Sequence, residues 1–263
     1  MKGRVLIIAG SDPSGGAGIQ ADIKTVTALG GYAMTAITAL TVQNTQGVSA
    51  VHPVAANVIA DQIDATLSDI GADAIKIGMI GDVETAVVIE AALKQYPNIP
   101  VVLDPVLVAT SGDALAKGGV AEFIRDHLLP ISYVVTPNTD EARALTGISV
   151  MDGDSAVRAG EALIAVGADV ALVKGGHLNG PTVEDTLVSA DGVQVFTTPR
   201  LDTTSTHGTG CTLSSAIATE IAQGNGLQTS IKRAIDYVNK AIATAPGFGN
   251  GHGPLNHCHT VDD

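Results

Sequence analysis

Aromatic residues, cysteine and positive charge are all scarce in this chain, and each shortage excludes something. Aromatic residues make up 3% of the 263 residues, so the hydrophobic core must be built from aliphatic side chains. The chain carries 27 acidic and 14 basic residues, a formal net charge of −13, which repels a phosphate backbone. We therefore expect no nucleic-acid partner, although a local basic pocket for a small anion stays open.

The two cysteines, Cys211 and Cys258, could form at most one disulfide, which is not the dense framework of a small secreted domain. A reducing cytoplasm is the simpler expectation. The apolar run at residues 5–9 is broken by Gly10 and is followed by no signal-peptide cleavage pattern. No stretch approaches the roughly 20 apolar residues of a membrane span. The sequence predicts a soluble chain with no membrane partner.

Short β-branched runs alternate with longer amphipathic segments, which is the pattern of βαβ units around a mainly parallel sheet. The expected strands are residues 5–9, 35–40, 74–77, 101–104, 133–136 and 170–174. The expected helices are residues 19–29, 55–68, 83–95, 120–129 and 155–166, with two more from about Cys211 and about Leu227. Residues 186–190 and 193–197 read as a β-hairpin on the Asp191-Gly192 turn. No segment has a linker's composition, so we predict one α/β domain over residues 1–263 with helices on both faces of the sheet.

Polar residues cluster directly after the expected strands. Ligands of open α/β sheets bind at the carboxyl ends of the strands, so these segments should converge on one rim of the sheet. They are residues 11–18, 43–44, Met79, 104–106, 137–141 and 175–177.

The first glycine-rich loop, residues 10–18, lies between a strand and a helix, as a dinucleotide-binding loop would. However, the acidic residue expected at the end of the next strand is missing, because residues 37–43 contain no carboxylate. A Walker-type motif is also absent from the sequence. The loop is then either a plain tight turn or one wall of a small-molecule pocket.

The second glycine-rich loop, Gly208-Thr209-Gly210-Cys211, precedes an apolar helix. Glycines let backbone amides approach a ligand, and a helix start adds unpaired donors and the positive end of its dipole. Such a turn suits an anion, most naturally a phosphoryl group. A thiol at a helix N-terminus should have a lowered pKa, which makes Cys211 a candidate base or nucleophile; the alternative is an inert small residue packed behind the helix.

Two carboxylates, Asp104 and Glu141, follow neighbouring strands and could face a Mg²⁺ ion that bridges nucleotide phosphates. The alternative for Glu141 is structural, since Asn138 and Glu141 also have the spacing of a helix capping box. Near the C-terminus, a cluster of histidines and one cysteine could bind zinc or copper. Adjacent residues of an extended tail point in opposite directions, so a packed or frayed tail is the favoured interpretation. The cluster consists of His252, His257, Cys258 and His259.

Several separate motifs, in order along nearly the whole chain, resemble the hydroxymethylpyrimidine/phosphomethylpyrimidine kinases of thiamin biosynthesis, which belong to the ribokinase-like superfamily. The motifs are residues 8–22 (IAGSDPSGGAGIQAD), 38–45 (TALTVQNT), 76–79 (KIGM), 104–106 (DPV), 136–138 (TPN) with Glu141, 173–177 (VKGGH) and 206–211 (THGTGC).

The resemblance implies a ribokinase-like α/β fold and two ATP-dependent phosphorylations, first of the 5-hydroxymethyl group of 4-amino-5-hydroxymethyl-2-methylpyrimidine and then of the monophosphate. It implies that Gln43 hydrogen-bonds the aminopyrimidine, an edge that a carboxamide suits. The remaining assignments that the resemblance implies can be listed by role. Ala17, Asp22, Met79 and Val106 would line the substrate pocket; Gly208, Thr209 and Gly210 would hold the transferred phosphoryl group; Lys174 and Asn138 would contact the nucleotide, and Asp104 and Glu141 would lie near Mg²⁺.

Many sugar kinases of this superfamily carry aspartate where this chain has Cys211, so the resemblance makes the thiol the candidate base toward the alcohol. A pyridoxal kinase is the nearest alternative, because vitamin B6 is also a planar heteroaromatic with a hydroxymethyl arm. A pyrimidine-binding sensor without catalysis is the alternative of another class. Family resemblance also implies a homodimer.

Overall fold

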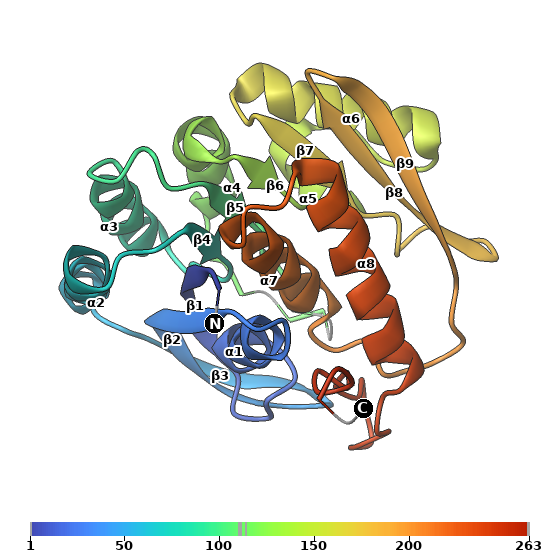
Figure 1. Cartoon of the computed structure of the whole chain (residues 1–263), viewed down its shortest axis with the longest axis horizontal. Helices are drawn as coiled ribbons and strands as arrows, with labels where there is room; N and C mark the ends of the chain where they lie inside the picture. The colour runs from blue at the N-terminus through green and yellow to red at the C-terminus, as the bar shows by residue number, and fades with distance from the viewer. Residues whose placement is uncertain (1, 110–111, 114, 262–263) are drawn as a thin grey trace.

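The computed structural model describes residues 2–109, 112–113 and 115–261. Its strands form one sheet in the order β3-β2-β1-β4-β5-β6-β7-β8-β9 (Figure 1). The parallel strands are β1 (Arg4–Ser11), β2 (Tyr32–Asn44), β4 (Ala74–Ile77), β5 (Val101–Leu103), β6 (Val134–Val135) and β7 (Val170–Val173). The antiparallel strands are β3 (Gly47–Pro53), β8 (Thr182–Ser189) and β9 (Gly192–Pro199).

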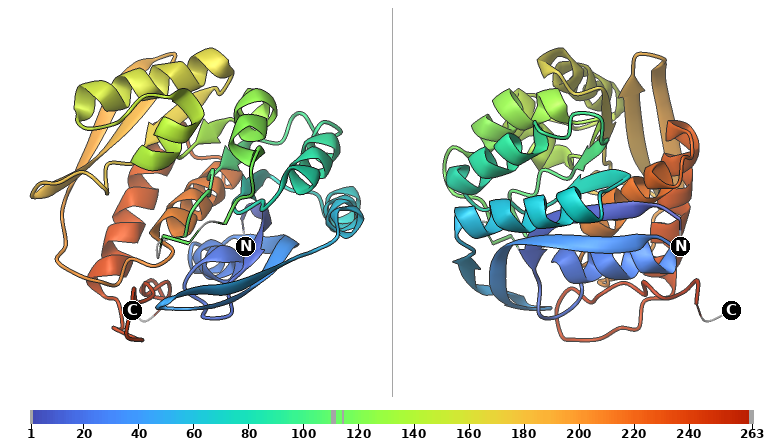
Figure 2. Two further views of the ribbon diagram at one scale, coloured as in Figure 1. Left: turned by 180° about the vertical axis from the view of Figure 1, so that it is seen from behind. Right: turned by 60° about the vertical axis from the view of Figure 1, so that its left-hand side comes forward.

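Helices cover both faces of this sheet (Figures 1 and 2). One face carries α1 (Gly18–Ala28), α7 (Thr209–Ala222) and α8 (Leu227–Ala243). The other face carries α2 (Ala56–Asp69), α3 (Val83–Leu93), α4 (Val120–Phe123), α5 (Thr139–Thr146) and α6 (Gly153–Val166). The α/β class predicted from the sequence is confirmed, with its mainly parallel sheet between two helical layers.

Strand β1 shows why the sheet is buried on both faces. Leu6 and Ile8 pack into the core on the α2–α6 side, whereas Val5 and Ile7 pack into the core on the α1, α7 and α8 side. Successive side chains of a strand point to opposite faces, and the strands of a parallel sheet covered on both sides are apolar at nearly every position. All four side chains are fully buried.

Three elements differ from the sequence prediction. Strand β3 was not predicted; it pairs antiparallel with β2 at the edge of the sheet, where its half-exposed residues lack a buried strand's apolar run. The helix expected at 120–129 is α-helical only to Phe123, and a π-helical turn (Ile124–Leu128) and a 3-10 turn (Leu129–Ile131) follow. The short helix α5 was foreseen only through its capping box.

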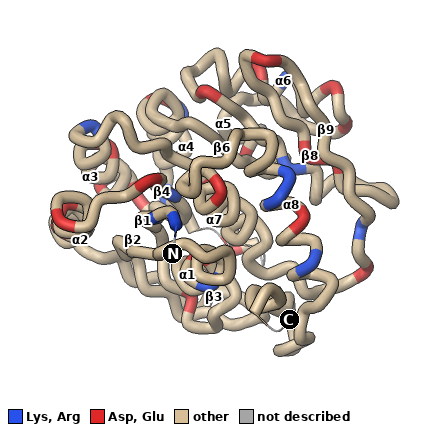
Figure 3. Tube along the Cα trace, viewed as in Figure 1, with Lys and Arg blue, Asp and Glu red and all other residues tan. Residues whose placement is uncertain are grey.

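The hairpin on Asp191-Gly192 is confirmed, with Ser189 paired with Gly192 across the turn. Basic residues are dispersed along the trace, and α8 carries Lys232, Arg233 and Lys240 (Figure 3). Over the part of the chain that the structure describes, none of the helices combines the length and the apolar character needed to cross a lipid bilayer.

Candidate active site

The two glycine-rich loops lie against each other at the carboxyl edge of the sheet. Gly208 has a left-handed backbone with φ of 80° and immediately precedes α7. A Cβ on Gly208 would collide with the carbonyl oxygen of Gly16, and a Cβ on Gly16 would collide with the ring of His207. The close approach of the two backbones therefore requires glycine at both positions.

The first turn of α7 offers backbone donors beside the part-buried ammonium group of Lys174. No side chain caps the helix start, and the amides of Thr209, Gly210 and Cys211 occupy the first three helical positions, which have no intrahelical partner. Of these three, the amide of Thr209 donates to the carbonyl oxygen of Thr206, outside the helix. A Cβ on Gly210 would stand 3.1 Å from the Nζ atom of Lys174, so the missing side chain leaves this ammonium group facing the turn. The arrangement supports the predicted anion site.

Lys174 lies between the two carboxylates that were predicted near Mg²⁺. Its Nζ atom is 3.0 Å from Oδ1 of Asp104 and 3.8 Å from Oε2 of Glu141. Both carboxylates are buried. Burial, with the help of the neighbouring Asp104, raises the pKa of Glu141 to about 7 against the opposing attraction of Lys174. Negative charge thus exceeds positive charge in this cluster.

Glu141 also forms a helix capping box with Asn138, the structural role that the sequence offered as the alternative to a metal ligand. Its Oε2 atom accepts from the Asn138 amide at 2.7 Å, while the Asn138 side chain accepts from the Asp140 and Glu141 amides. Carboxylate oxygens are the ligands that Mg²⁺ prefers. Lys174 contacts Oδ1 of Asp104, and the Asn138 amide donates to Oε2 of Glu141. The carboxylate donor set therefore fits a hard cation while the cap stays in place.

The raised pKa of Glu141 predicts a pH-dependent stability. From about pH 4.5, its ordinary value, to about pH 7 the unfolded chain releases a proton that the folded chain retains. The free energy of unfolding should therefore fall over this window, by up to about 3 kcal/mol from this group. Denaturant unfolding at pH 5 and pH 8 measures the effect, and Glu141→Gln should flatten it. Equal pH slopes for both proteins would contradict the assignment.

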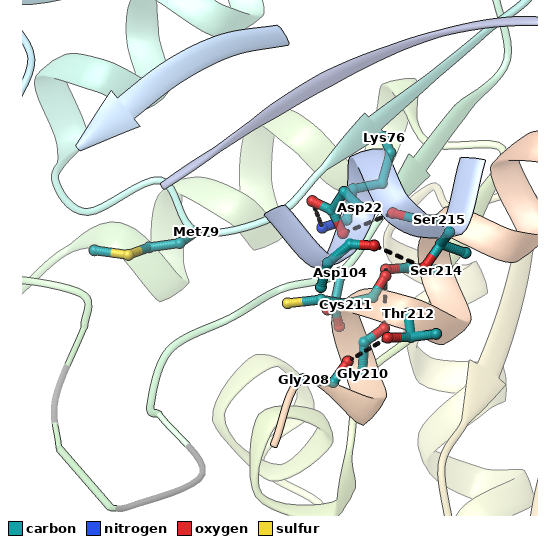
Figure 4. Close-up of polar contacts among 12 residues, drawn as sticks. Asp22, Lys76, Met79, Asp104, Gly208, Gly210, Cys211, Thr212, Ser214 and Ser215 are labelled. Carbon is teal, nitrogen blue, oxygen red and sulfur yellow. Dashed lines mark hydrogen bonds and ion pairs between the residues drawn. The ribbon is translucent and has the colours of Figure 1, made fainter. Parts of the chain in front are cut away.

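Cys211 stands at the third position of α7, with Sγ pointing away from the helix (Figure 4). Burial raises its pKa to about 12, and the carboxylates of Asp22 and Asp104 add to this while Lys76 opposes it. The lowered pKa predicted from the helix start is therefore wrong. Desolvation outweighs the helix dipole here, and the side chain is a neutral thiol near pH 7.

Asp22 was expected at the pocket wall, and its position corrects that expectation. Its side chain on α1 is fully buried, where Oδ2 lies 2.8 Å from Nζ of Lys76 and Oδ1 accepts from Ser215 of α7 at 2.7 Å (Figure 4). Lys76 lies in the motif at residues 76–79 and had no predicted role. The available signal was a lysine inside the apolar strand sequence Ala-Ile-Lys-Ile, because a charge in a buried strand needs a partner.

Among the expected substrate-pocket residues, Ala17, Met79 and Gln43 lie in or near the glycine-rich loops. Gln43, half-buried at the end of β2, lines a cavity of about 380 Å³ together with Val48 and Asp113. Ala17 caps α1, and its amide donates to Asp12. Met79 lies against Gly10 and points away from Cys211 (Figure 4). Val106, half-buried, follows β5.

Two buried residues of the loops, Asp12 and His207, had no predicted role. Their side chains are joined by a 2.8 Å contact between Oδ2 of Asp12 and Nε2 of His207. The same ring nitrogen lies 3.4 Å from Nε2 of Gln43. Asp12 and His207 are 195 positions apart in the chain, so no local pattern revealed the pair.

The C-terminal segment packs against the α7 turn. His257 is buried and contacts Thr212 at 3.0 Å, and the His259 ring packs on Tyr237. Cys258 is exposed. Among the residues with described positions, no group of three or more His, Cys, Asp or Glu side chains is arranged to hold a metal ion. The packed tail is the interpretation that the structure supports.

A mainly parallel sheet with an open helix start and a lysine–carboxylate cluster is the arrangement expected of a small-molecule kinase of the ribokinase-like class. The model of the phosphomethylpyrimidine kinase family matches residues 12–256. The chain belongs to this family.

Individual relatives agree with this placement. The chain is 45% identical to the hydroxymethylpyrimidine/phosphomethylpyrimidine kinase of Rhizobium meliloti, over 97% of this chain and 96% of that protein. It is 47% identical to the thiamine biosynthesis bifunctional protein ThiED of Geobacter sulfurreducens, over 100% of this chain but only 54% of that longer protein. Among solved structures, an ADP complex of Bacillus subtilis pyridoxal kinase superposes with a TM-score of 0.92 at 31% identity, covering 100% of both chains.

Proposed function

We propose that this protein is a hydroxymethylpyrimidine/phosphomethylpyrimidine kinase, which uses ATP to phosphorylate the 5-hydroxymethyl group of 4-amino-5-hydroxymethyl-2-methylpyrimidine and then the monophosphate. The product serves thiamine biosynthesis. The observation that carries the proposal is the start of α7, where Gly210 leaves backbone donors and the Lys174 ammonium facing one space. Phosphoryl transfer depends mainly on positioning and charge stabilisation of this kind.

The nucleotide part of the proposal rests on Lys174, Asn138 and the two carboxylates. The structurally similar pyridoxal kinase was solved with ADP, which supports ATP as the donor. Asp104 and Glu141 would hold Mg²⁺, which neutralises phosphate charge when it is bound. Lys174 would face the transferred group, since it lies within 4 Å of both carboxylates.

The substrate part rests on Gln43, Ala17, Met79 and Val106, with Thr209 and its glycine neighbours at the reacting end. A carboxamide donates and accepts in one plane, which matches the amino group and ring nitrogen of an aminopyrimidine. Asp22 is buried on α1, where it accepts a hydrogen bond from Ser215 of α7, and it is not part of this contact set.

Cys211 is proposed to contact the substrate hydroxyl. A neutral thiol is a weak hydrogen-bond acceptor, so it orients the alcohol while the helix start and Lys174 supply most of the rate. A thiolate base would instead make the alcohol step accelerate with pH toward about 12, the value to which burial raises the pKa of Cys211.

Cys211→Ala should therefore slow phosphorylation of the alcohol about tenfold or more, as loss of an orienting contact does, and phosphorylation of the monophosphate much less, because that acceptor needs no help from the thiol. Single-turnover assays on each acceptor measure the two rates. Comparable losses in both steps would show that Cys211 has no special role toward the alcohol.

A pyridoxal kinase is the second candidate, favoured by the structural similarity to the Bacillus subtilis enzyme. A steady-state ATP assay with the pyrimidine alcohol and pyridoxal in competition separates the two. We expect kcat/KM to be higher for the pyrimidine; a preference for pyridoxal would overturn the assignment, and tight pyrimidine binding without ATP turnover would indicate a sensor. A homodimer and a cytoplasmic location stay predictions.

A further inference from the structure

The Asp12–His207 pair lies beside Gln43 and determines which way the Gln43 carboxamide is turned. The Asp12 carboxylate is buried and receives hydrogen bonds from the Ser14 amide, the Ser14 hydroxyl and the Ala17 amide, at 2.8, 2.9 and 2.9 Å. A carboxylate that accepts this many donors is ionised. Although burial alone would raise its pKa, the hydrogen bonds from His207 and Ser14 keep that pKa below the ordinary value.

An ionised Asp12 determines where the His207 proton is. The 2.8 Å contact joins Oδ2 of Asp12 to Nε2 of His207, so this nitrogen must carry a hydrogen, in the neutral ring and in the imidazolium alike. Nε2 of His207 is then only a donor. Any group beside it must be an acceptor.

That group is the Gln43 carboxamide, 3.4 Å away. A nitrogen of Gln43 in that place would set donor against donor, whereas its oxygen would accept a second, longer branch of the His207 hydrogen bond. Carboxamide oxygen and nitrogen are distinguished by such networks.

Thr41 leads to the same orientation from the other side. Its hydroxyl has one hydrogen and two oxygens within reach, the Ser11 carbonyl at 2.9 Å and the atom placed as Oε1 of Gln43 at 3.2 Å. The shorter contact, to Ser11, takes the hydrogen. The hydroxyl oxygen is then left as an acceptor, which suits the amide nitrogen of Gln43 and not its oxygen. The structure draws the amide with Nε2 toward His207 and Oε1 toward Thr41. The donor–acceptor pattern at both contacts requires the reverse assignment, with the oxygen toward His207 and the nitrogen toward Thr41.

We infer that His207, held by Asp12, is a specificity-determining residue that locks the Gln43 carboxamide with its oxygen toward His207. This inference rests on the proposed function for the identity of the substrate. The locked amide accepts from the 4-amino group on the His207 side and donates to ring nitrogen N3 on the Thr41 side. The hydroxymethyl arm is next to the amino group on the ring, so the same orientation directs the arm toward the α7 turn, which follows His207 in the chain.

The test compares two substrates that differ only in donor–acceptor order. In 5-hydroxymethyl-2-methylpyrimidin-4-one the amine is replaced by a carbonyl and N3 carries a hydrogen, which reverses the pattern. A site that hydrogen-bonds its substrate rejects the mismatched analogue strongly. Wild-type protein should prefer the 4-amino compound by about 100-fold or more in kcat/KM.

His207→Phe keeps a ring of similar shape but frees the carboxamide to rotate, so the preference should fall to about tenfold or less. Thr41→Val removes the second contact with little change of shape and should also reduce the preference. His257→Phe, in the other buried histidine beside α7, is the matched control and should leave the ratio unchanged. A purely structural role for His207 would lower kcat/KM for both compounds alike.

Binding of both compounds without ATP gives a second measure of the same ratio. If wild-type protein binds the 4-amino compound more tightly than the 4-one and His207→Phe loses this preference, the inference is supported. This holds even if neither compound is phosphorylated, a result that would refute the proposed function. The inference is overturned if both His207→Phe and Thr41→Val keep the wild-type ratio of binding affinities. It is also overturned if wild-type protein binds the two pyrimidines equally well.

Discussion

Replacing Lys174 by methionine should lower kcat with Mg-ATP by about 100-fold to 1000-fold, the range for removing one group that stabilises transition-state charge. Lys174 is the cation that faces Gly210 at the start of α7 and lies 3.0 Å from Asp104. Methionine keeps the length of the side chain but removes the charge. Without it, the phosphoryl group would lose the ammonium group that offsets the two buried carboxylates. Steady-state and single-turnover kinetics with the pyrimidine alcohol measure the loss.

Lys174→Arg and an unfolding curve serve as controls for this variant. Arginine keeps the charge, so we expect it to recover part of the activity, although its planar group fits a lysine site imperfectly. Denaturant unfolding reports whether Lys174→Met remains folded. A folded Lys174→Met protein with kcat within about threefold of wild type would remove the lysine from the proposed site.

Replacing Lys76 by methionine should lower the free energy of unfolding by about 3–5 kcal/mol, the cost of leaving one partner of a buried ion pair alone. Lys76 and Asp22 have fully buried side chains 2.8 Å apart. Each depends on the other, because burial by itself disfavours both charges while the partner raises the pKa of Lys76. Within the described part of the chain, the variant would leave the buried Asp22 with the Ser215 hydroxyl as its remaining hydrogen-bond partner.

The double variant Lys76→Met with Asp22→Asn should recover most of this loss, because a neutral amide costs far less to bury than a carboxylate. Lys232→Met is the matched surface control. It breaks an ion pair with Asp236 whose side chains are 67% and 60% exposed, so its effect should stay below about 1 kcal/mol. Equal effects for Lys76→Met and Lys232→Met would show that burial does not set the strength of the pair.

The sequence predicted the features that depend on neighbouring residues. Apolar runs located the central strands, and the spacing of Asn138 and Glu141 indicated a capping box that the structure contains. The rim of polar residues followed from a general property of parallel sheets. Strand β3 was not predicted because it lies at the edge of the sheet, where pairing with β2 holds it and it has no apolar pattern of its own.

The missed features depend on contacts between distant parts of the chain. Asp22 and Lys76 are 54 positions apart, and Asp12 and His207 are 195 apart. The Cys211 pKa was predicted with the wrong sign because a helix start is visible in the sequence whereas desolvation is not. Burial and the carboxylates of Asp22 and Asp104 come from packing against α1 and β5, and they raise the pKa that the helix start alone would lower.

The central claim is two successive phosphorylations of an aminopyrimidine alcohol at the start of α7. Wild-type protein incubated with Mg-ATP and 4-amino-5-hydroxymethyl-2-methylpyrimidine, quenched over time and analysed by mass spectrometry, tests it most directly. The account predicts that the monophosphate appears first and the diphosphate follows, with one ADP formed for each phosphoryl group transferred. Absence of both phosphorylated products, with the pyrimidine recovered unchanged, would contradict it.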